Sequence, residues 1–182
     1  MPESSKLAAF QAAVLPHLGA AYNLARWLTR NHHDAEDLVQ EAYLRAFKSF
    51  EAFRGGADGR GWLLTIVRNA CYTRMRRDGQ DVTDVFDEEI HTGENESANP
   101  ETLLIEQADA EVLRRALEEL PVEFREVIVL REIEGLSYKE MAHVAGVPVG
   151  TVMSRLARAR ARLERRLRGS SGKEARIDLS RE

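Results

Sequence analysis

Several features that would indicate other classes of protein are scarce or absent in this chain. Its 182 residues include a single cysteine, Cys71, which excludes an intramolecular disulfide and a cysteine-based zinc site. No apolar run approaches the roughly 18–20 residues that span a bilayer, so direct membrane insertion is not expected. The start, MPESSKLAAF, lacks a basic stretch followed by an apolar one, so no signal peptide is indicated. We expect a cytoplasmic protein.

Basic residues are missing from one segment and crowded in another. The net charge is −4, but residues 78–101 contain 9 acidic residues and no Lys or Arg. Residues 1–77 contain 11 basic and 7 acidic residues, and residues 149–168 contain seven Arg and one Glu. A nucleic acid or partner protein would therefore meet a local charge that differs from the overall charge.

Residues 6–77 show the periodicity of helices. Apolar residues at spacings of three and four predict a helix over Leu18–Thr29. Asp34 is expected to be the N-cap of the next helix, since its carboxylate can accept from backbone amides. Three glycines in 54–59 interrupt the pattern before a last helix, Arg60 to Arg76.

Periodicity is lost over residues 78–100, which are acidic and contain Gly, Asn, Ser and Pro, as a flexible linker does. A second helical domain follows over 101–168, and the tail, 169–182, is expected to be frayed. The sequence thus predicts an all-α chain of two small helical domains joined by a flexible acidic linker.

The second domain is predicted to contain a helix-turn-helix. Ser137 and Glu140 have the spacing of a capping box, Gly146 can adopt the left-handed turn conformation, and Pro148 suits the start of the next helix. In that helix Val152, Leu156, Ala159 and Leu163 fall on the inward face. The opposite face contains Thr151, Ser154, Arg155, Arg158, Arg162 and Arg165, although a solvated basic face would show the same pattern.

Three segments, covering about 120 of the 182 residues, resemble the extracytoplasmic-function sigma factors. Residues 120–167, and above all GTVMSRLARAR, resemble the family's fourth conserved region. DAEDLVQEAYLRAFKSFEAF (34–53) resembles its polymerase-binding segment, and GWLLTIVRNACYTRMRR (61–77) its segment for the melted promoter.

The resemblance implies three sets of site residues. Asp37, Gln40, Glu41 and Arg45 would bind the clamp helices in the largest subunit of core RNA polymerase. Arg54, Arg60, Arg68, Asn69, Thr73 and Arg76 would bind the melted (minus-10) promoter element. Thr151, Ser154, Arg155, Arg158 and Arg162 would bind the upstream (minus-35) element. Trp62 also matches the family, either as a core residue or by stacking on a base.

The resemblance further implies promoter DNA and an anti-sigma factor as partners, a role in a stress or envelope response, and no cofactor, metal or enzymatic activity. The linker could enter the polymerase channels as a mimic of RNA charge, or it could be a soluble spacer.

Two other functions remain open from the residues themselves. A regulator that binds its operator alone could use the same helix-turn-helix. Residues 1–77 are, however, too short and too basic for a receiver domain. A metal-dependent nuclease could use Asp84, Asp87, Glu88 and Glu89, but a flexible segment would not hold their carboxylates in a fixed geometry.

Overall fold

The computed structural model describes residues 3–53, 59–80 and 110–178, with side chains as far as residue 168. Within these ranges all regular elements are helical, which confirms the all-α prediction. Arg54, most of the predicted linker and the four carboxylates of the nuclease hypothesis lie outside the described residues.

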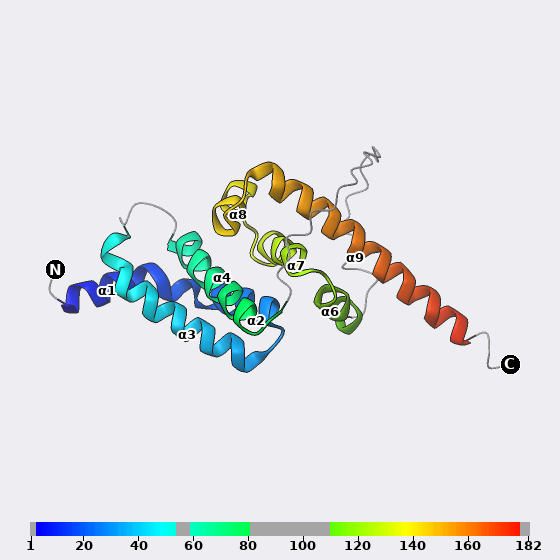
Figure 1. The fold of residues 1–182 in the computed structure, drawn as a ribbon, viewed down its shortest axis with the longest axis horizontal. Helices are drawn as coiled ribbons and strands as arrows, with labels where there is room; N and C mark the ends of the chain where they lie inside the picture. The colour runs from blue at the N-terminus through cyan, green and yellow to red at the C-terminus, as the bar shows by residue number, and fades with distance from the viewer. Residues whose placement is uncertain (1–2, 54–58, 81–109, 179–182) are drawn as a thin grey trace.

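The N-terminal half is a bundle in which three helices pack on one another (Figure 1). Its elements are α1 (Glu3–Val14), the 3-10 helix η1 (Leu15–His17), α2 (Leu18–Thr29), α3 (His32–Ser49), the 3-10 helix η2 (Phe50–Ala52) and α4 (Gly59–Arg77). Helices α2, α3 and α4 contact each other around fully buried leucines, including Leu24, Leu28 and Leu63. The helix predicted over Leu18–Thr29 is confirmed at both ends.

The N-cap predicted for α3 was wrong by three positions. Asn31, not Asp34, caps the helix, because its side chain accepts hydrogen bonds from the backbone N–H groups of His33 and Asp34. Asp34 instead lies in the first turn, where the helix dipole favours a carboxylate. Asparagine and aspartate are about equally good N-caps, so composition alone did not distinguish them.

The C-terminal half contains α6 (Ala110–Glu118), α7 (Val122–Ile128), the π-helix η3 (Val129–Ile133), α8 (Tyr138–Ala145) and α9 (Val149–Asp178). Helices α8 and α9 form the predicted helix-turn-helix. The capping box is confirmed: Ser137 accepts from the N–H of Glu140, and the Glu140 carboxylate accepts from the N–H of Ser137. The pKa of Glu140 is lowered by these hydrogen bonds.

Helix α9 is longer than the sequence predicted. Its backbone continues to Asp178, past the predicted end of the second domain at residue 168, and runs away from the rest of the molecule (Figure 1). The predicted inward face is confirmed, since Val152, Leu156, Ala159 and Leu163 are all buried.

The two halves pack against each other. Helix α8 contacts α4, while α7 and η3 contact α2. Buried apolar side chains from both halves belong to one cluster. The sequence predicted two domains and a linker but contained no sign of this interface.

Gly146 offers a test of the helix-turn-helix turn. It has φ +67°, whereas Gly150 lies in α9 with no positive φ, and neither would meet another atom within 4 Å of an added Cβ. We expect Gly146→Ala to lower the free energy of unfolding by about 1 kcal/mol, because alanine strains at positive φ. Gly150→Ala, the control, should leave it unchanged or raise it. Chemical denaturation measures both, and equal stabilities would contradict the strain argument.

Candidate nucleic-acid and polymerase interface

The outer face of α9 is less basic than its sequence suggested. Among the predicted upstream-element residues only Ser154 is exposed, while Thr151, Arg155, Arg158 and Arg162 are half-buried. The most exposed positions in the first turns also include two apolar residues, Val149 and Met153, the latter 52% exposed. Neither residue was predicted from the sequence, although their spacing of four residues places them on one side of a helix.

Arg162 is held against its own domain. Its guanidinium lies 4.8 Å from the ring centroid of Phe124 on α7, within the range of a cation–π contact. Arg160 likewise donates to Glu132 at 2.5 Å. Part of the arginine-rich stretch therefore stabilises the packing of α9. Ser154 and Arg158 lie in the N-terminal part of α9, which follows the turn of the helix-turn-helix.

The exposed face of α4 contains Asn69, Thr73 and Arg76, as the sequence predicted. The two other described residues of that set, Arg60 and Arg68, are instead bound by carboxylates from the C-terminal half. Arg60 donates to the Glu134 carboxylate at 2.8 Å, and Arg68 donates to Glu126 at 2.6 Å.

Glu126 is the most deeply buried of these groups. Its side chain is 0% exposed, and its second carboxylate oxygen accepts from the Tyr72 hydroxyl at 2.9 Å. Burial would lower the pKa of Arg68, but the Glu126 carboxylate outweighs burial, and the pKa of Arg68 is raised. Burial, together with the Glu126 charge, raises the pKa of Tyr72. The site thus combines a buried ion pair with a phenol whose hydroxyl donates to the same carboxylate.

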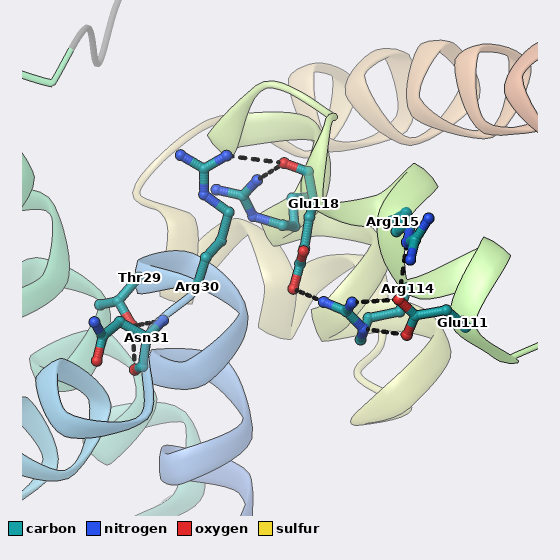
Figure 2. Close-up of polar contacts among 8 residues, drawn as sticks. Thr29, Arg30, Asn31, Glu111, Arg114, Arg115 and Glu118 are labelled. Carbon is teal, nitrogen blue, oxygen red and sulfur yellow. Dashed lines mark hydrogen bonds and ion pairs between the residues drawn. The ribbon is translucent and has the colours of Figure 1, made fainter.

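A second polar junction lies at the end of α2 (Figure 2). Arg30, at φ +58°, donates to the backbone carbonyl of Glu118 at 3.2 Å. Arg125 is buried and donates to the same carbonyl and to that of Leu28. Burial, together with the charge of Arg30, lowers the pKa of Arg125 to about 10, so Arg125 remains a cation at neutral pH.

Trp62 belongs to an aromatic group near the start of α4. Its ring stacks on Phe53 with centroids 4.6 Å apart, and Phe50 lies beside it. These contacts favour the packing role over stacking on a base.

The predicted polymerase-binding residues share the exposed side of α3. Asp37, Gln40, Glu41 and Arg45 are all exposed, and Glu41 pairs with Arg45. Leu44 lies among them with 64% of its surface exposed, and it was not predicted from the sequence. An exposed leucine among polar groups is typical of a surface that binds another protein.

Within the described residues, no group of three or more His, Cys, Asp and Glu side chains could hold a metal ion, and no helix has the length and apolar content to cross a membrane.

Two protein-family models match this chain, one in each half. The model of sigma-70 region 2 matches residues 13–80, and that of sigma-70 region 4 matches residues 110–163. Relatives that are 35% and 37% identical are both described as ECF RNA polymerase sigma factors. The chain belongs to the extracytoplasmic-function sigma factors. It is therefore in a family of non-catalytic RNA polymerase subunits. We call residues 13–80 region 2 and residues 110–163 region 4.

Two relatives show how far the similarity extends. The sigma factor is 37% identical over 161 residues to the ECF RNA polymerase sigma factor SigE of Mycolicibacterium smegmatis, covering 88% of this chain and 62% of that protein. It is 35% identical over 141 residues to the ECF RNA polymerase sigma-E factor of Escherichia coli, covering 74% of each. The chain thus spans less than two thirds of the first relative.

Two solved structures share the fold. One is the sigma factor RpoE in complex with the anti-sigma factor NepR from Bartonella quintana, with a TM-score of 0.68, 33% identity and coverage of 87% of this chain and 96% of that one. The other is CnrH in complex with the cytosolic domain of CnrY, with a TM-score of 0.63, 28% identity and coverage of 88% of both chains.

The position of Arg162 predicts a structural role. We expect Arg162→Ala to lower the free energy of unfolding by about 0.5–2 kcal/mol, because its contact with Phe124 is partly desolvated. Arg165→Ala, at an exposed position of the same helix, should change stability by less than about 0.5 kcal/mol. Denaturant unfolding distinguishes the two. A fully stable Arg162→Ala variant that loses base preference would instead place Arg162 on DNA.

Proposed function

We propose that this sigma factor binds core RNA polymerase and directs it to promoters through two DNA contacts, one from each region. One observation supports this most directly. A single chain combines an exposed, mixed polar and apolar face on α3 with a helix-turn-helix whose second helix contains Ser154 and Arg158 in its N-terminal part.

The α3 face is the proposed polymerase contact. Asp37, Gln40, Glu41 and Arg45 would form a polar rim around Leu44, an arrangement common in protein interfaces. Asn69, Thr73 and Arg76 on α4 would bind the melted strand, with Arg60 and Arg68 joining them once they leave their glutamates. We place the protein in the cytoplasm, where it would meet the polymerase.

An anti-sigma factor is the proposed inhibitory partner. One similar solved structure is bound to an anti-sigma factor, and the other is bound to the cytosolic domain of CnrY. In this chain such a partner would cover the exposed α3 face and so block the proposed polymerase contact. A stress or envelope response is the corresponding proposed setting.

The general test is transcription from a library of promoters by core polymerase, with and without the protein. Promoter-specific initiation should depend on its addition. Tight binding to one sequence by the protein alone would favour the independent regulator instead.

Charge reversal tests the polymerase contact. We expect Glu41→Lys to weaken association with core polymerase by about tenfold, which corresponds to about 1.4 kcal/mol. Glu164→Lys is a matched control, because Glu164 is also an exposed carboxylate paired with an arginine four residues away. Binding of labelled protein to core measures both. Equal affinities would remove Glu41 from the interface.

Recognition of bases in the upstream element should depend on the N-terminal part of α9. We expect Arg158→Ala to cost about 1–3 kcal/mol at the upstream element and to change its base preference, as loss of a base contact does. Arg165→Ala, further along the helix, should weaken all sequences equally. The measurement is binding of reconstituted holoenzyme to wild-type and mutated upstream elements over a salt series. Equal loss on both elements for Arg158→Ala would show that Arg158 only positions the domain.

A further inference from the structure

The interface between the two regions contains two ion pairs, each formed by a glutamate of region 4 and an arginine of region 2. Region 4 contributes the carboxylates of Glu126 and Glu134, and region 2 contributes the guanidinium groups of Arg68 and Arg60. Both glutamate side chains are nearly inaccessible, at 0% and 7% exposed. The pairs are therefore built into the contact between regions.

The geometry at both arginines is that of anion recognition. Arg68 donates from Nε to Glu126 at 2.6 Å while its guanidinium lies 4.0 Å from the centroid of the Tyr72 ring. Arg60 donates from Nη2 to the Glu134 carboxylate at 2.8 Å, and Asn23 donates to the other oxygen at 3.0 Å. Arginine binds phosphate oxygens with the same donors.

These two arginines belong to the set proposed for the melted promoter strand. We propose that Glu126 and Glu134 act as internal substitutes for backbone phosphates, so that region 4 competes with promoter DNA for Arg68 and Arg60 of region 2. The inference rests on the proposed function, which supplies the DNA as competitor. The closed arrangement is then self-inhibited, and separation of the regions exposes the arginines.

The energetics make such a contact reversible. A buried ion pair gains little net stability, because removing both charges from water offsets their attraction. When the regions separate, water solvates both partners again, and no charge is left buried without a counterion. Replacing one glutamate in the closed form does leave such a charge on the arginine, which favours opening.

The test uses the full-length free protein and two matched double variants. E126Q/E134Q removes the carboxylates that cross the interface. E119Q/E132Q makes the same change of charge, but Glu119 pairs with Arg166 and Glu132 with Arg160, both within the C-terminal half.

Two quantities are measured on each protein. The first is the distance between dyes on Glu36→Cys and Lys139→Cys, two exposed positions in the two halves. Cys71 is buried, and burial followed by the Glu126 charge raises the pKa of its thiol to about 12, so it reacts slowly with the dyes. The second is the affinity for a single-stranded DNA of random sequence.

We expect E126Q/E134Q to show a longer distance and an affinity about threefold to tenfold higher, because more molecules are in the competent form. The control should match the wild type in both. If the double variant is poorly folded, the single variant Glu134→Gln, at the edge of the interface, is used in its place. It should change the distance and the affinity in the same directions.

Three results would overturn the inference: no change in distance, an equal gain in affinity for the control, or an opened protein that binds DNA no better. Failure of the proposed function is seen separately, as wild-type holoenzyme that does not initiate from any promoter. That result would leave the interdomain distances as they were measured.

Discussion

The carboxylate of Glu126 is the group around which the arrangement of the two regions is organised. It lies on α7, fully enclosed, and both of its oxygens accept hydrogen bonds from α4, one from Arg68 and one from Tyr72. A charge in this position is tolerated only while those donors are present. This one side chain therefore links α7 to two residues of α4.

Other polar contacts also join elements of region 2 to elements of region 4. Arg30 and Arg125 hold the end of α6 against the end of α2, and Glu134 holds the end of η3 against Arg60 (Figure 2 shows the first of these junctions). Polar groups can be rehydrated on separation, whereas a wholly apolar interface would expose surface to water. An interface of this kind suits two domains that must change partners.

The surfaces for partners lie outside the interface. The α3 face and Ser154 in the N-terminal part of α9 remain exposed in the packed arrangement, while two arginines of the α4 set are engaged within the interface. Core polymerase could therefore approach α3 before the regions separate. The three proposed contacts thus differ in availability: two are open, and the third is partly occupied by the protein's own glutamates.

Local structure could be predicted from the sequence because it depends on interactions between residues that are close together in the chain. The spacing of apolar residues predicted α2 and the inward face of α9, and the capping box at Ser137 followed from hydrogen bonds between near neighbours. The burial of Glu126 and the engagement of Arg60 and Arg68 could not be predicted in this way. Their partners are 54 to 74 residues distant in the chain, so only the tertiary structure decides which charges meet.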